Sequence, residues 1–321
     1  MNLSSCAIVG ILTAAAAVAS LLGGRTTTRA AGNQAPAQSS AAADAALPAV
    51  STTLEVESVT KRKFYALPDS QGAVAAAKQK LDGDPKNLEL LRAFEQEQVK
   101  VWQYREALET CARGLQIAPQ TAAFYVERGH REVALQQFAE TITDMNHAIE
   151  LDPSIGDIYY HLGLAHYFRG EFDQAADAFG KSVKIAQSKG ADATDGVTNS
   201  TNWYYVALRR AGKKEEAAKA LEAVGPEVTT KDAHSQVYLN LVRFYQGKMK
   251  DSEVVEREPP RDGHVYLEPE LKFDTSAYQV GNWYLYNGNP AKARTYFERI
   301  AKGGVWITWG FVGAQVELAK K

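Results

Sequence analysis

The side chains best suited to chemistry in this 321-residue chain are its six histidines and two cysteines. Histidine acts as a general base or metal ligand, and a cysteine thiolate acts as a nucleophile or metal ligand. His161 and His166 are five residues apart, which places them on different faces of a helix, and no histidine belongs to an HExxH motif. Cys6 lies in the N-terminal segment, so Cys111 is the only thiol of the folded part. An intramolecular disulfide or a cysteine-based metal site is therefore excluded there.

Other catalytic signatures are also missing from the sequence. It contains no GxSxG elbow, no P-loop and no GxGxxG after a strand. Cys111 falls at an apolar helix position, which favours a buried structural thiol. The formal net charge is -2, and acids and bases are interspersed, which argues against a nucleic-acid partner. The sequence predicts no enzyme activity, no catalytic residue, no metal and no cofactor.

The elements that position these side chains follow a 34-residue period. Pro85, Pro119 and Pro153 close three similar phrases, LDGDP, LQIAP and IELDP. This period defines repeats over 88–121, 122–155 and 156–189. Small or large side chains recur at fixed places of these frames, namely Ala107, Gly129, Gly163, Ala175 and Phe179.

The period has a physical meaning in the third frame. Gly163 and Ala175 are small where two helix axes must approach closely. Gly170 permits a sharp turn between the two helices, and Pro153 ends the preceding helix. Each frame is thus an antiparallel helix pair that cannot bury its apolar face alone, and stacked pairs form a superhelix.

This pattern resembles the tetratricopeptide-repeat family. The resemblance implies an all-α solenoid of antiparallel helix pairs in a right-handed superhelix, here over residues 70–321. A lone helix over 70–82 precedes the regular repeats, and degenerate pairs follow over 198–255. After a loop over 256–273, a last pair is expected at 274–303 and a capping end helix at 305–319. The last pair carries the repeat positions Gly281, Ala293 and Phe297.

The order of regular pairs, degenerate pairs, loop and end helix is similar to that of bacterial periplasmic adaptor lipoproteins of the NlpI type. That resemblance implies an adaptor that brings envelope proteases and peptidoglycan hydrolases together. The chain departs from it in one respect. Cys6 precedes the apolar stretch 6–24, whereas a lipoprotein cysteine follows it, so lipid anchoring does not carry over.

The N-terminal region is expected to direct export. Residues 1–29 predict a signal peptide or a membrane anchor, and both remain open because cleavage and retention are each compatible with the apolar stretch. Residues 30–69 begin with an Ala/Gln/Ser/Pro-rich stretch and predict a flexible linker. The expected location is periplasmic, or membrane-anchored facing the periplasm or exterior, with membrane contact only through this segment.

A partner is expected in the concave groove lined by the first helix of each pair. The groove positions of the repeats are Val126, His130, Val133, Asp157, Tyr160, Leu164, Tyr167, Phe168, Tyr278, Asn282, Leu285 and Tyr286. An aromatic groove of this kind suits an extended segment or an amphipathic helix. Aromatic residues at helical spacing also form cores, so both interpretations remain open for Tyr160, Tyr167 and Phe168.

One specific ligand is excluded. Repeats that clamp a C-terminal carboxylate place Lys, Asn, Asn, Lys and Arg at fixed groove positions. The corresponding side chains here belong to Arg92, Gln96, Glu127, Asp157 and His161, and two acids would repel a carboxylate.

The sequence therefore predicts a non-enzymatic scaffold that binds protein partners, with a homodimer left open. The alternative is a regulatory accessory subunit of an envelope protease or peptidoglycan hydrolase, which would change the activity of its partner. A catalyst within the 256–273 loop is disfavoured, since that loop offers His264 and acids but no nucleophile or metal set.

Overall fold

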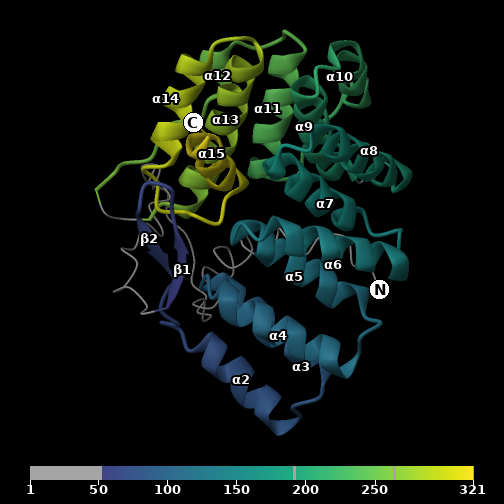
Figure 1. Ribbon diagram of the computed structural model, residues 1–321, viewed down its shortest axis with the longest axis vertical. Helices are drawn as coiled ribbons and strands as arrows, with labels where there is room; N and C mark the ends of the chain where they lie inside the picture. The colour runs from purple at the N-terminus through teal and green to yellow at the C-terminus, as the bar shows by residue number, and fades with distance from the viewer. Residues whose placement is uncertain (1–52, 191–192, 263–264, 321) are drawn as a thin grey trace, which may run out of the picture.

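A computed structural model describes residues 53–190, 193–262 and 265–320 (Figure 1). The predicted export segment 1–29 and most of the predicted linker lie outside these residues. The described part is an all-α stack of antiparallel helix pairs with one small β-hairpin. Within the described residues, no helix is both long and apolar enough to cross a membrane.

The regular repeats appear where the 34-residue period places them. The lone helix α2 (Ala73–Gly83) is followed by the pairs α3 (Leu88–Lys100) with α4 (Tyr104–Ile117), α5 (Ala122–Ala134) with α6 (Phe138–Leu151), and α7 (Gly156–Arg169) with α8 (Phe172–Ser188). Pro85, Pro119 and Pro153 each lie two residues beyond the last residue of a helix. The prediction that they mark helix ends is confirmed.

The degenerate half also forms helix pairs. They are α9 (Thr194–Arg210) with α10 (Lys214–Ala220) and the 3-10 turn η3 (Leu221–Ala223), α11 (Ala233–Tyr245) with α12 (Asp251–Val254), α13 (Leu267–Tyr286) with α14 (Pro290–Ile300), and the end helix α15 (Trp309–Ala319). The predicted loop 256–273 is wrong from Leu267 onward. Pro269 stands in the first turn of α13, where a missing N–H costs no helical hydrogen bond.

The small residues of the repeat lie where the two helices of a pair come into contact. A Cβ at Gly163 would lie 2.7 Å from the Phe179 ring, and one at Gly281 would lie 2.7 Å from the Phe297 ring. A Cβ at Gly129 would clash with the Met145 methyl group. The alanines that recur in the repeats, Ala107, Ala175 and Ala293, are fully buried. The helix-contact role predicted for these positions is confirmed.

The turn between the two helices has a left-handed backbone in all six of the described pairs. Glycine occupies this place in the later repeats, with φ of 83° at Gly170, 81° at Gly212, 74° at Gly247 and 83° at Gly288. The first two repeats place Trp102 and Gln136 at the same position, with φ of 58° and 61°. The same turn therefore forms without glycine, at a backbone cost that L-residues pay in this region.

A β-hairpin precedes the helices and was not predicted. β1 (Leu54–Glu57) pairs antiparallel with β2 (Lys63–Tyr65), so the predicted flexible linker 30–69 extends too far at its C-terminal end. The Arg105 guanidinium of α4 donates to the carbonyl oxygens of Leu54 and Glu55. On the other side, the Phe64 ring packs edge-on against Phe311 of α15, at 5.1 Å between centroids. The hairpin thus joins the first repeat to the end helix (Figure 1).

Candidate protein-binding groove

The predicted groove residues lie on the first helices of their pairs, on α5, α7 and α13, as expected. Four of them are half-buried, namely Val126, Asp157, Leu285 and Tyr286. The other eight are buried in the interior, namely His130, Val133, Tyr160, Leu164, Tyr167, Phe168, Tyr278 and Asn282. In the described conformation these eight side chains are not accessible to a partner.

The start of the end helix α15 reaches the early repeats, while most of the helix packs on α13 and α14. Trp309, its first residue, lies against His130 of α5 at 5.1 Å and against His161 of α7 at 6.0 Å between ring centroids. Just before α15, Trp306 packs edge-on against Tyr104 at 5.2 Å. The prediction that this helix caps the open end is therefore incomplete, because its start lies inside the superhelix.

Helix α13 closes the groove from the opposite side. The Tyr167 hydroxyl of α7 donates a hydrogen bond of 2.9 Å to the Asn282 side-chain oxygen of α13. Arg210 of α9 donates to the same oxygen at 2.8 Å and to the Glu317 carboxylate of α15 at 2.9 Å. Four helices, α7, α9, α13 and α15, therefore meet at one polar junction inside the superhelix.

The core interpretation holds for Tyr160, Tyr167 and Phe168 in this conformation. Their rings pack against Phe179 and Trp203, at 5.9 Å for Tyr160–Phe179 and 5.4 Å for Tyr167–Trp203. Whether the groove residues bind a partner in another conformation stays a prediction. One signal in the sequence indicates the burial. The stretch VWITWGFVGA at 305–314 is apolar on every side, which is typical of a helix enclosed by protein rather than one on an open end.

Charged side chains near the groove are paired with one another. Arg92 forms a 2.6 Å ion pair with Glu127, one of the two acids at the clamp positions. Arg131 and Glu95 form an ion pair of 2.8 Å with both partners buried. These contacts neutralise the charges that a carboxylate clamp would need, in line with the exclusion of that ligand.

The histidines of the groove are arranged for packing. His130 and His161 stack at 4.4 Å between ring centroids, and the His161 Nδ1 lies 2.8 Å from the Asp157 carbonyl oxygen. Burial lowers the pKa of His161 to about 4 and holds the pKa of His130 well below its ordinary value, so both rings are neutral at neutral pH. Among the described residues, no group of three or more His, Cys, Asp or Glu is placed to hold a metal ion.

Cys111 is fully buried on α4. Burial raises the pKa of its thiol well above the ordinary value, which disfavours the nucleophilic thiolate. His166 is half-buried, and its Nδ1 lies 2.6 Å from a Glu171 carboxylate oxygen. The surroundings of Cys111 and His166 therefore indicate a structural role for both side chains.

Comparison with known proteins agrees with this architecture. The model of the tetratricopeptide repeat family matches residues 156–189, the frame made of α7 and α8. The α7–α8 pair thus matches a tetratricopeptide repeat by sequence. The small glutamine-rich tetratricopeptide repeat-containing protein 2 of Saccharomyces cerevisiae is 27% identical over 124 residues, which are 39% of this chain. The matched part spans only 33% of that yeast protein.

Comparison with solved structures gives matches of low overall similarity. A crystal structure of MamA is 22% identical and covers 56% of this chain and 91% of its own, with a TM-score of 0.43. The structure of YrrB, described as a tetratricopeptide-repeat protein with an unusual peptide-binding site, is 16% identical. It covers 71% of this chain and 92% of its own, with a TM-score of 0.42.

Proposed function

We propose that this chain is a non-enzymatic adaptor of the cell envelope that binds a segment of a partner protein in its concave groove. Tetratricopeptide repeats mediate protein–protein interactions, and the α7–α8 pair of this chain matches such a repeat. To this general role the proposal adds the concave groove as the binding site and the cell envelope as the location. Export is supported by the apolar stretch near the N-terminus, and the partner class, an envelope protease or cell-wall hydrolase, by the resemblance to periplasmic adaptors.

The observation that carries the proposal is the position of α15. Its first residue, Trp309, packs against rings of α5 and α7, while Glu317 in its last turn binds Arg210. The groove therefore accommodates a helix with aromatic and acidic side chains. A partner helix that presents the same groups would use the same contacts, which is the helix-in-groove mode of recognition.

The intramolecular helix makes binding competitive. A partner can reach His130 and His161, which Trp309 covers, only in the fraction of molecules in which α15 has left the groove. Its apparent affinity is the intrinsic affinity multiplied by that fraction. A substitution that weakens the seating of α15 should therefore increase partner capture, whereas one that removes groove side chains should decrease it.

This contrast provides the test. Intact protein and a Trp309→Ala variant are used in a crosslinking pull-down from the native cell envelope, together with a His130→Ala, His161→Ala variant that removes the two rings under Trp309. Ile117→Ser serves as the control because Ile117 is 40% exposed on the outer surface. Circular dichroism first establishes that each variant is folded. The same proteins should be enriched with Trp309→Ala, lost with the double variant and unchanged with the control.

The outcome that contradicts the proposal is equal capture by all four proteins, which would place the partner on another surface. Capture of cytosolic proteins alone would contradict the envelope location. The alternative function is tested on the same material. If a captured protease or hydrolase changes its turnover when this protein is added, the chain regulates its partner as an accessory subunit.

A further inference from the structure

A second surface, on the outer side of the superhelix, has the features of a binding site. Its walls are the second helices of the first two repeats, with Leu108, Glu109 and Ala112 on α4 and Glu140, Thr143 and Asp144 on α6. Its floor is α5, with Arg128 and Glu132. The cleft has a volume of about 480 Å³. The cleft is separate from the concave groove, and a role for it does not depend on the function proposed for the groove.

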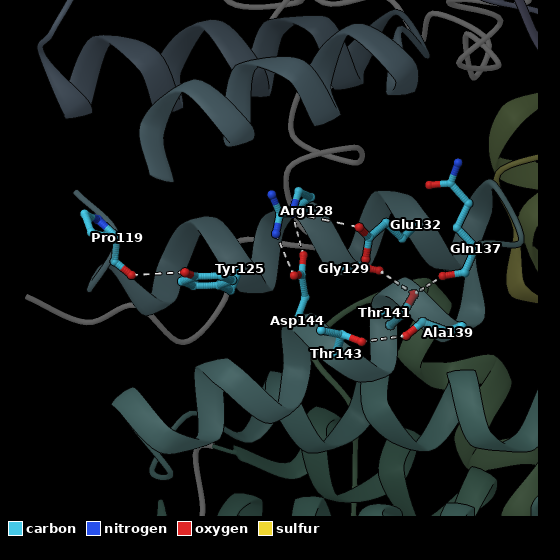
Figure 2. A network of polar contacts seen from close by, with 10 residues as sticks. All are labelled: Pro119, Tyr125, Arg128, Gly129, Glu132, Gln137, Ala139, Thr141, Thr143 and Asp144. Carbon is cyan, nitrogen blue, oxygen red and sulfur yellow. Dashed lines mark hydrogen bonds and ion pairs between the residues drawn. The ribbon is translucent and has the colours of Figure 1, made fainter. Parts of the chain in front are cut away.

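Most of the titratable side chains of this cleft are acidic. Four carboxylates, from Glu109, Glu132, Glu140 and Asp144, face one cation, Arg128. The Arg128 guanidinium is already used, because its Nε and a terminal nitrogen each donate a 2.6 Å hydrogen bond to an Asp144 oxygen (Figure 2). Three carboxylates therefore remain without a strong cationic partner in the cleft.

Glu132 is the side chain that points to a ligand. It is only 6% exposed, yet among the described residues its Oε2 is buried without a hydrogen-bond partner. Its Oε1 lies 3.9 Å from the Arg128 Nε, beyond hydrogen-bond distance. A buried carboxylate oxygen without a partner is costly, and a cation in the cleft would remove that cost.

The acidic set is specific to this junction and is not part of the repeat framework. One period away from Arg128 stand Phe94 and Leu162, and one period after Asp144 stands Ala178. The place of Glu132 is taken by His166 in the third repeat. The equivalent cleft between α6 and α8 thus lacks the buried acid and its ion pair, so the fold does not require them.

The walls also offer apolar surface. Leu108 and Ala112 line one side, opposite the methyl group of Thr143. A lysine or arginine side chain has an apolar stem and a cationic head, and both parts are matched here. A hydrated metal ion would not use the apolar wall, and the described residues hold no group of three acids or histidines placed around one point.

We propose that this cleft binds a lysine or arginine side chain of a partner protein, with Glu132 as the buried counter-charge and Glu109 and Glu140 at the rim. The stem of the bound side chain lies against Leu108 and Ala112. Arg128 keeps its place on Asp144 and fixes the orientation of the floor. The cleft would then select a basic segment of the partner.

Binding should be linked to proton release. Burial raises the pKa of Glu132 to about 8, with the nearby Asp144 adding to this rise and Arg128 opposing it. Glu132 is thus mostly protonated at neutral pH, and an incoming cation lowers its pKa and expels the proton. The cation prefers the ionised form, so affinity increases as the pH rises toward about 8. The other charged groups of the cleft are Glu109 on α4, Arg128 on α5, and Glu140 and Asp144 on α6.

The test is calorimetric titration of the full chain with an acetylated and amidated peptide of alternating lysine and alanine, in about 50 mM salt. The same peptide with acetyl-lysine, spermine and MgCl₂ are the comparison ligands. The lysine peptide should bind and the acetyl-lysine peptide should not. Affinity should rise several-fold between about pH 6.5 and about pH 8.5, with release of up to about one proton per site.

Variants locate the binding. Glu132→Gln should weaken binding about tenfold and abolish its pH dependence, and Glu140→Gln, at an exposed rim position, should weaken it about threefold. Asp177→Asn is the matched control. It removes one exposed carboxylate from α8 at the place equivalent to Thr143, and it should leave binding unchanged.

Three results would overturn the proposal. Equal weakening by Asp177→Asn and Glu132→Gln would mean that only the overall surface charge attracts the peptide. Spermine or Mg²⁺ binding as tightly as the peptide, and displaced by it, would assign the cleft to a free cation. Absence of peptide binding by the folded chain would leave the cleft without the proposed partner.

Discussion

At the scale of single residues, the turn between paired helices has the same left-handed backbone in different repeats but carries different side chains. Gln136 and Trp102 both adopt left-handed φ values where later repeats have glycine. Gln136 is half-buried, whereas the Trp102 indole is buried and packs edge-on against Trp306 at 6.3 Å. The backbone cost is the same at both positions, but only Trp102 offsets it with substantial core packing.

We therefore expect opposite results from the same substitution. Gln136→Gly should stabilise the protein by about 0.5–1 kcal/mol, because glycine adopts this φ without strain. Trp102→Gly should destabilise it by about 3 kcal/mol or more, because the packing on Trp306 is lost. Urea unfolding followed by circular dichroism gives both values. Destabilisation by both substitutions would mean that the turn strain is negligible at Gln136.

At the scale of helices, the sequence predicted the repeats well, because their period depends on contacts within and between neighbouring pairs. Gly163 and Phe179 are only sixteen residues apart in the sequence, so the pattern itself specifies their contact. The seating of α15 depends instead on contacts between distant segments, such as Trp309 with His130. No periodicity encodes those contacts, and the groove position predicted at His130 is covered by Trp309, which lies in a segment that the repeat pattern does not describe.

The hairpin was missed for a related reason. β1 and β2 are four and three residues long, and the segment between them is rich in lysine and arginine. Such short strands give little alternation of apolar and polar residues, and a two-stranded hairpin is marginal by itself. Its order comes from packing on α4 and α15, through Arg105 and Phe311, which a local pattern does not reveal.

The polar junction between α9 and α15 gives a prediction at this scale. Arg210 and Glu317 are paired at 2.9 Å, and their side chains are only 11% and 7% exposed. Arg210→Met should destabilise the protein by about 2 kcal/mol, because Glu317 then keeps only the half-exposed Lys320 as a cationic partner. Adding Glu317→Gln should recover a large part of that loss.

A double-mutant cycle from urea unfolding measures this coupling. The control is the exposed pair Arg294 and Glu298 on α14, whose side chains are 58% and 50% exposed. Arg294→Met should cost less than about 1 kcal/mol. If the Arg210 and Arg294 substitutions cost the same, the buried junction does not hold α15 in place.

At the scale of the whole molecule, the hairpin connects the two ends of the superhelix. It is held to the first repeat by Arg105 and to the end helix by two contacts, the ring pair of Phe64 with Phe311 and a 2.9 Å hydrogen bond from the Val59 N–H to the Gln315 Oε1. A solenoid whose ends are joined cannot open its concave side by small changes at each repeat. Release of α15 therefore requires that the hairpin contacts break.

Phe64→Ala tests this coupling between the hairpin and the groove. The buried ring of Phe64 packs on α15, so its removal should lower the free energy of α15 opening by about 2–4 kcal/mol. Each 1.4 kcal/mol is about a tenfold change in the opening equilibrium, so amides of α15 should exchange hydrogen at least about thirtyfold faster. Amides of α7 and α8 should keep their protection, because their contacts with each other do not involve the hairpin. Val59→Ala is the control, since the Val59 side chain is 41% exposed and its N–H remains.

Faster exchange confined to the hairpin would show that α15 stays in place without the hairpin contacts. Faster exchange in all helices alike would show that the molecule opens only by global unfolding.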